Sequence, residues 1–394
     1  MLNNTHRDNW IDYLRSSITV LVVAHHCSLA YTTFASFDAN AYINSTHPVV
    51  DTQRWIGLDI FENFNDIFFM SLMFFIGGLF LTKSLTKKGV AAFLKDRCYR
   101  LFLPFLFGVS VLMLLAYFPA YYLAHHDLDI PAYIKDFFTT EQWPVGPPWF
   151  IWVLFAFNAL FGISWLLFKN AYIRAGKAIQ RLASRPFLFF GLFIGITWIT
   201  YVPLSAAIGM GTWTGIGPFD FQLNRVILYF AYFILGVITG SGDFQQGLFS
   251  RDAALTRHWK VWCIGALIAY TLITLNGIYE PLRNMVIKGM MPPLAAWMIY
   301  FTVYVSSCTL SCIAFLTAFR AKSNSTGPWM DSLTANAYMI YLVHYIFVLW
   351  TQFILLPLHA PAGIKFLLSF FGTLLLSWGL SIVLRKIKIV QQYI

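Results

Sequence analysis

Long apolar runs dominate this sequence and decide what it can fold into. A helix needs roughly 20 apolar residues to cross a bilayer, and ten runs approach that length. They are residues 16–35, 64–82, 101–124, 149–168, 187–208, 224–241, 260–276, 294–319, 335–356 and 364–384. None shows the ten-residue alternation of a barrel strand. The sequence therefore predicts an all-α fold, a polytopic transmembrane helical bundle of about ten helices.

The composition agrees with residence in lipid. Of 394 residues, 58% are hydrophobic and only 11% are charged, whereas soluble domains carry about 25% charged residues. No stretch resembles a separate soluble domain, so we expect residues 1–394 to form one integral membrane domain. The cysteines lie in or beside the apolar runs without metal-ligand spacing, and we interpret them as packing residues with no metal site. They are Cys27, Cys98, Cys263, Cys308 and Cys312.

Basic residues alternate between the loops. Of the 27 lysines and arginines, 21 fall on one side of the predicted helices, including Arg7 and Arg15 before the first run. Loops rich in lysine and arginine face the cytoplasm, so the pattern predicts that both termini are cytoplasmic. The net charge of +10 then reflects membrane topology and does not indicate a nucleic-acid partner.

The first run carries an unusual set of polar residues. Arg15 and His26 are three helical turns apart, within roughly 20° of one face, with His26 about 16 Å deeper. A cation at the entrance and a base at depth suit an anionic ligand that enters from the cytoplasm. Asp12 would pair with Arg15 or lie in water at the helix start, and His25 would pack beside His26 and orient it, or else be catalytic itself. The other interpretation is that Arg15 reaches the interface and His26 bonds a neighbouring helix.

Two more runs contain polar residues that lipid would not tolerate without partners. Asn65 and Asp66 stand at the start of the second run. They would contact a polar acceptor, orient His26, or simply end a helix in water. Tyr341 and His344 share one face of the ninth run. His344 is a second candidate site residue, or else an ordinary partner between two helices.

Arginines also mark the entrance to the third run. Arg97 and Arg100 share a face there, and two guanidinium forks suit a phosphate group. Their alternative role is to anchor the helix at the cytoplasmic surface. Trp149 stands at the start of the fourth run, where aromatic residues anchor a helix at the interface.

Small residues predict where helices approach one another. Gly191 and Gly195 are four positions apart, as are Gly236 and Gly240. That spacing puts both glycines of a pair on one helix face, and we expect each pair to permit close helix packing.

Five motifs in the same order resemble the acyltransferase 3 family of bacterial membrane proteins, and in particular its glucan succinyltransferase branch. The resemblance covers residues 8 to about 350. The first motif is Asp12-Tyr13-Leu14-Arg15 followed, after ten residues, by His26. The others are 64–70 (FNDIFFM) with 77–80 (GGLF), Arg97-x-x-Arg100-Leu101-x-x-Pro104, 146–150 (GPPWF) and 340–344 (IYLVH).

The resemblance implies a multi-pass O-acyltransferase of the bacterial inner membrane. It would move an acetyl or succinyl group from acyl-CoA to a hydroxyl of a sugar, glycan or polysaccharide, with no permanently bound cofactor. His26 carries over as the catalytic residue and Arg15 as its motif partner, while Arg97 and Arg100 would bind the acyl-CoA. We expect neutral His26 to act as general base, with its tautomer set by Asp66.

A proton-coupled secondary transporter is the alternative function, since buried histidine, arginine and aspartate also serve proton coupling. Inverted repeats and paired broken helices are typical of transporters, and the sequence shows neither clearly.

Overall fold

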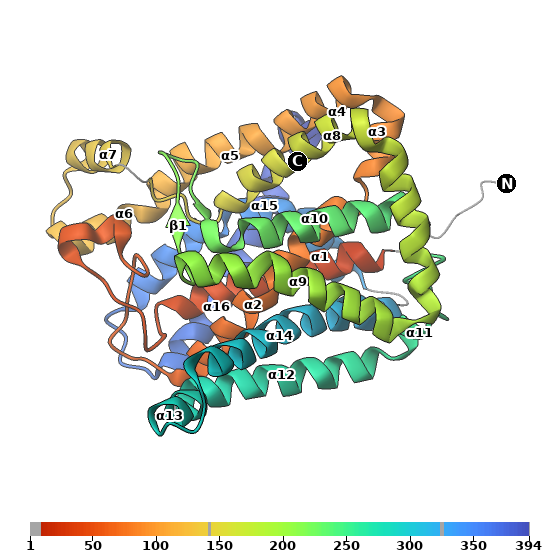
Figure 1. Ribbon diagram of the computed structural model, residues 1–394. Helices are drawn as coiled ribbons and strands as arrows, with labels where there is room; N and C mark the ends of the chain where they lie inside the picture. The colour runs from red at the N-terminus through yellow and green to blue at the C-terminus, as the bar shows by residue number, and fades with distance from the viewer. Residues whose placement is uncertain (1–8, 141–142, 324–326, 394) are drawn as a thin grey trace.

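The computed structural model describes residues 9–140, 143–323 and 327–393, and this part is almost entirely helical (Figure 1). Arg7 lies outside the described residues. The long helices are α1 (Trp10–Leu29), α2 (Ile56–Gly78), α8 (Trp149–Gln180), α9 (Pro186–Ile208), α10 (Val226–Ser241), α12 (Trp259–Tyr279), α14 (Pro293–Lys322), α15 (Pro328–Leu355) and α16 (Ala362–Leu384). The shorter elements are α3 (Leu81–Lys88), α4 (Val90–Arg97), α5 (Leu103–Phe107), α6 (Met113–His125), α7 (Ile130–Thr139), α11 (Ala254–Arg257), α13 (Pro281–Ile287), α17 (Lys388–Tyr393) and the paired strands β1 (Trp213–Thr214) and β2 (Phe221–Gln222).

The bundle has the predicted class. Within the described residues, nine helical segments are long and apolar enough to cross a membrane. One of them, Val90–His125, runs continuously through α4, α5 and α6. Helix α1 has 20 residues but is more polar than the others, and it packs against α2, α14, α15 and α16. The prediction of an all-α polytopic bundle is confirmed, and each predicted apolar run coincides with a helix.

Helix α1 begins earlier than its apolar run. The run starts at residue 16, but the helix starts at Trp10, whose side chain is fully buried. The first two turns therefore include Asp12 and Arg15, which pair at 3.2 Å. Neighbouring helices surround α1 and supply hydrogen-bond partners for several of its polar side chains, which lipid could not do.

The two ends of the bundle differ in charge. Helices α3, α4 and α11 lie at one end, on the right of Figure 1, and α7, α13 and the β1–β2 hairpin lie at the other. Helix α11 contacts the short turn Arg181–Ser184 at the end of α8, and α3 contacts α10. The connections richest in lysine and arginine thus gather at the first end, which we call the basic end. The other is the opposite end.

Glycines on α10 allow it to approach α2 closely. A Cβ atom added at Gly236 or Gly240 would collide with backbone carbonyl groups of α2. Close packing at this pair is confirmed. At Gly191 and Gly195 on α9, no neighbouring heavy atom of the described residues lies within 4 Å of an added Cβ. The prediction of close packing there is wrong, because no described residue packs against these two glycines.

We predict that Gly240→Ala destabilises the protein by about 1–3 kcal/mol, because the new methyl group forces α2 and α10 apart. The thermal unfolding midpoint in detergent, followed by tryptophan fluorescence, measures this. Gly191→Ala is the matched control, and it should leave the midpoint unchanged or raise it, since alanine favours a helix more than glycine. Equal midpoints for the two variants would contradict the packing argument.

Candidate active site

His26 lies in the last turn of α1, sixteen residues and about 24 Å from the start of that helix. Because α1 begins early, His26 lies beyond its midpoint, nearer the opposite end of the bundle. Its Nδ1 is 2.9 Å from the carbonyl oxygen of Val22. A carbonyl can only accept, so Nδ1 carries the proton of the neutral ring and Nε2 keeps its lone pair. The side chain is only partly buried, as a base that must meet a substrate requires.

A second histidine contacts His26 directly. His344 Nδ1 lies 2.6 Å from the carbonyl oxygen of Tyr341, and His344 Nε2 lies 3.2 Å from His26 Nδ1. By the same argument His344 donates through Nδ1, so its Nε2 accepts from His26. His344, fully buried on α15, is therefore the interhelical partner that holds the His26 ring.

His25 lies on the other side of His26. Their rings pack edge to face, with centroids 5.2 Å apart. His25 Nε2 is 3.8 Å from a carboxylate oxygen of Glu62, and His25 Nδ1 is buried without a hydrogen-bond partner among the described residues. The expected packing role of His25 matches this placement.

Asp66 lies deep in the bundle. Helix α2 starts at Ile56, so Asp66 is about 15 Å inside the helix and not at its wet terminus. Its carboxylate receives two hydrogen bonds from Arg225, at 2.9 and 2.6 Å. Among the described residues no hydrogen bond joins Asp66 to His26, and the tautomer role expected of Asp66 falls to the carbonyl of Val22.

The partner of Asp66 is itself well bonded. Arg225 is buried at the start of α10 and donates to the Tyr304 hydroxyl at 2.7 Å as well as to Asp66. Asn65, the neighbour of Asp66, is fully buried, and its amide has no partner among the described residues. Sequence reasoning missed Arg225, because a single arginine near a helix end resembles an ordinary interfacial residue.

Three arginines converge at the basic end. Arg15, Arg97 and Arg100 line one cavity of about 450 Å³, together with apolar side chains of α2 and α8. Tyr341, whose carbonyl binds His344, lines the same cavity. The cavity thus has a cationic rim and contains Tyr341 in its wall, while His26 and His344 are not among the residues that line it. The sequence placed these arginines on one side of the bundle, and they come from two separate helical segments.

The helix that carries Arg97 and Arg100 contains a wider, π-helical turn at Arg100. Pro104 has no N–H group, so it cannot bond the carbonyl of Arg100 one turn earlier. A π-helical turn at Cys98–Phe102 accommodates this, and the Arg100 carbonyl accepts from the Tyr338 hydroxyl at 2.8 Å instead. Wide turns of this kind often occur at functional sites, and this one ties the arginine segment to α15.

Acidic neighbours hold the arginines without neutralising them. Asp96 lies 3.1 Å from Arg100, 3.8 Å from Arg97 and 3.2 Å from Lys88, and Asp12 pairs with Arg15. The Nε of Arg97 is buried and has no hydrogen-bond partner among the described residues. This group of charges keeps an excess of donors, which suits a polyanionic ligand.

Polar residues that the sequence did not single out surround His26 towards the opposite end. Gln352 donates to the carbonyls of His26 and Cys27, and its Oε1 accepts from His47 Nε2 at 2.8 Å. The Tyr345 ring lies 5.3 Å from that of His26. Tyr345 and Gln352 lie on α15 at helical spacing from Tyr341 and His344, which the sequence did single out, and that spacing was the available signal. His47, on a loop, offered none.

Trp149 is the first residue of α8 and follows the loop that contains Pro147. The Tyr341 hydroxyl donates to the Pro147 carbonyl, just before α8 begins. The Trp149 ring packs edge to face on Trp213 of β1, at 5.4 Å, and leans on Tyr229 at 5.8 Å. Trp149 therefore anchors the start of α8 to the hairpin and to α10.

A metal site in a protein usually groups several histidine, cysteine, aspartate or glutamate side chains. In the part of the chain that the structure describes, no three of these side chains group in a way that holds a metal ion. The five cysteines are free, and Cys27, Cys308 and Cys312 are buried, as expected of packing residues.

Comparison with known proteins identifies relatives. The sequence profile of the acyltransferase domain of the acyltransferase 3 family matches residues 8–383. Glucans biosynthesis protein C of Shigella dysenteriae serotype 1 is 22% identical over 283 residues, which cover 69% of this chain and 67% of that protein. The protein of the same name from Salmonella heidelberg is 25% identical over 275 residues, 68% of this chain and 66% of its own length. No solved structure matches the chain.

We predict that Asp66 is needed first for stability. Asp66→Asn leaves buried Arg225 without its counter-charge, which costs about 2 kcal/mol. This is less than a fully buried pair would cost, because the Asp66 side chain keeps 37% exposure. The double variant Asp66→Asn/Arg225→Gln should recover part of the thermal stability lost in Asp66→Asn. A double variant less stable than the single one would contradict this assignment.

We predict that buried His47 makes the stability of the fold sensitive to acid. Burial lowers the pKa of His47 from 6.5 to about 4. Between these two pH values the histidine is protonated in the unfolded chain and neutral in the folded chain. Stability is unaffected above pH 7 and falls between pH 6.5 and 4, by up to about 3 kcal/mol. His47→Gln keeps the donor to Gln352 without titrating. Its melting temperature should therefore fall less on acidification than the wild type's, and parallel curves would contradict the prediction.

Proposed function

The chain belongs to the acyltransferase 3 family, and from that membership we propose that it moves an acyl group from cytoplasmic acyl-CoA to a hydroxyl of a glycan, with His26 as general base. It is a multi-pass membrane O-acyltransferase. The observation that carries the finer proposal is the single cavity in which Arg15, Arg97 and Arg100 form a cationic rim and Tyr341 reaches towards the His26 cluster.

An acyl-CoA matches this cavity in charge and in shape. Its phosphates would lie among the guanidinium groups, where hydrogen bonds between charged partners are strongest. The pantetheine arm is flexible and nearly uncharged, and it would extend past the apolar side chains of α2 and α8. Along α1, His26 is eleven residues and about 16 Å beyond Arg15, so the arm would carry the thioester inward from the rim to the base.

His26 Nε2 then supplies the base. The acceptor hydroxyl gives its proton to Nε2 as its oxygen attacks the thioester carbonyl. The tetrahedral intermediate collapses, the carbon–sulfur bond breaks, and the proton passes to the leaving thiolate, so that no proton is gained or lost overall. His344 and the Val22 carbonyl keep the proton on Nδ1 and so hold the lone pair on Nε2. An imidazole suits this exchange because it both takes and returns a proton near neutral pH.

The charge asymmetry supports an orientation. The basic end would face the cytoplasm of a bacterium whose inner membrane holds the protein, and acyl-CoA would enter there. His26, nearer the opposite end, would meet an acceptor that approaches from outside. Matched relatives are named for glucan biosynthesis, which supports a glycan acceptor, and either an acetyl or a succinyl group would serve as the acyl group.

His26→Ala tests the proposal. We expect this variant to abolish acylation of surface glycans, measured by mass spectrometry in cells that lack the native gene, while its abundance in the membrane stays normal. His359→Ala, a change at an exposed histidine, should leave acylation intact. Full acylation by His26→Ala would overturn the assignment of the base. Solute movement down a proton gradient in proteoliposomes without acyl donor would favour the transporter.

The arginine rim has its own test. Arg97→Glu/Arg100→Glu should weaken binding of acyl-CoA to purified protein at least tenfold, because each lost charged hydrogen bond is worth roughly 1.5 kcal/mol or more. The control Arg174→Glu/Lys177→Glu reverses two exposed charges on α8 outside the cavity and makes the same change in net charge. Equal affinity in the Arg97→Glu/Arg100→Glu variant and the control would remove Arg97 and Arg100 from the donor site.

A further inference from the structure

A seam between α2, α12 and α14 contains two cavities that the acyltransferase site does not use. The first holds about 440 Å³ and the second about 290 Å³, and Tyr270 of α12 lines both. Along α14 the two cavities extend from Phe319 to Tyr300, nineteen residues and about 28 Å. That length is close to the roughly 30 Å hydrocarbon thickness of a bilayer.

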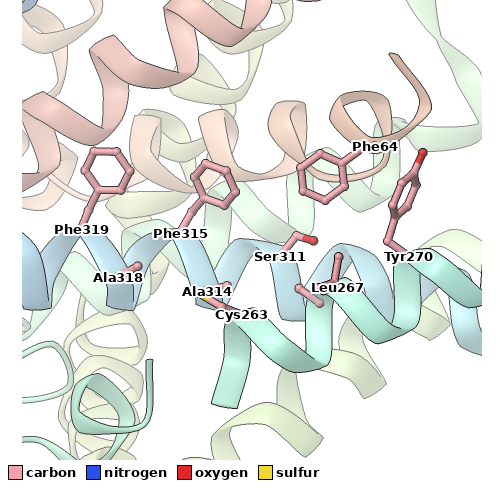
Figure 2. A pocket seen from close by; sticks show the side chains of 10 residues that line it. Phe64, Cys263, Leu267, Tyr270, Ser311, Ala314, Phe315, Ala318 and Phe319 are labelled. Carbon is pink, nitrogen blue, oxygen red and sulfur yellow. The ribbon is translucent and has the colours of Figure 1, made fainter. Parts of the chain in front are cut away.

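The first cavity is an apolar groove. Figure 2 shows the rings of Phe64, Phe315 and Phe319 in a row, with Cys263 and Leu267 of α12 facing them. Ser311 is one of its few polar lining groups. The Leu267 side chain is 66% exposed, so the groove opens to the outside of the bundle, where lipid surrounds the helices.

The second cavity is more polar than the first, although isoleucines also line it, and it lies at the opposite end. Asp59, Asn63, Thr274 and Tyr300 line it. No described residue shares a hydrogen bond with the Tyr300 hydroxyl, whereas Asp59 is already satisfied by the backbone N–H and the hydroxyl of Thr33.

No lysine or arginine lines this cavity. Arg225 donates to the hydroxyl of Tyr304, which lines this cavity, but Arg225 is already paired with Asp66. The cavity therefore offers hydroxyl, amide and ring surfaces, and no unpaired cation among the residues that line it.

We propose that this seam binds a membrane amphiphile with an uncharged, hydroxyl-bearing head and a hydrocarbon chain. The head would lie in the polar cavity beside Tyr300 and Asn63, and the chain would follow the groove past Tyr270 towards Phe319. Three observations on the seam carry this: it is about as long as a membrane is thick and its apolar part opens outward, its second cavity adjoins the first across Tyr270, whose hydroxyl donates to the Ile60 carbonyl, and the only charged side chain lining the second cavity is a satisfied carboxylate. A phosphate head would meet that carboxylate without a compensating cation.

Cys263 provides the test, since it lines the groove and is only partly buried. The full-length protein in nanodiscs is treated with N-ethylmaleimide, and the rate of Cys263 alkylation is followed by peptide mass spectrometry. Dodecyl glucoside, the probe, should slow alkylation about tenfold. Dodecyl phosphate, which has the same chain and an anionic head, should slow it less than twofold. No protection by the glucoside, or equal protection by both amphiphiles, would overturn the proposal.

A second measurement locates the head. Tyr300→Phe should raise the glucoside concentration needed for half protection about tenfold, because it removes a hydroxyl that would bond the head. Tyr279→Phe, at an exposed tyrosine outside both cavities, should not change that concentration. Equal values for the two variants would contradict the placement of the head. These tests need no acyl transfer, so their outcome is independent of the proposed function.

Discussion

The structure depends on one constraint: lipid offers no hydrogen bonds, so a polar group in the membrane is costly unless another part of the protein bonds to it. Helix α1 concentrates this requirement, because it carries Asp12, Arg15, His25 and His26 on one 20-residue helix. Helices α2, α14, α15 and α16 enclose it and supply partners, among them Glu62 of α2 and His344 of α15. The apolar helices at the edge of the bundle shield these contacts from lipid.

The same constraint explains the remaining buried charges. Asp66 with Arg225, and Asp51 with Lys365 at 2.6 Å, are pairs drawn from segments far apart in sequence. Lys365 and Asp51 are almost completely buried and join α16 to the loop after α1. Because an unpaired charge at such a position is costly, these pairs fix the relative positions of α2, α10 and α16 around the helix that carries His26.

Sequence patterns predicted the fold class and the position of each spanning helix, since apolar run length depends only on local composition. They also predicted that Arg15, Arg97 and Arg100 would lie at one end, because the count of lysines and arginines in alternate loops assigns each loop to one side of the bundle. They did not predict the start of α1, the pairing of Asp66 with Arg225 or the contact between His344 and His26. Each of these depends on which helices become neighbours, and helix periodicity alone does not determine that.

The central claim is that donor and base meet within one continuous site. The most direct measurement is a structure of the protein with a non-hydrolysable acyl-CoA analogue bound. We predict that the phosphates lie among Arg15, Arg97 and Arg100. The acyl carbonyl carbon should lie close enough to His26 Nε2 for one acceptor hydroxyl to fit between them, with the hydroxyl oxygen roughly 3–3.5 Å from that carbon. An analogue bound elsewhere, or an acyl group that ends about 10 Å or more from His26, would contradict it.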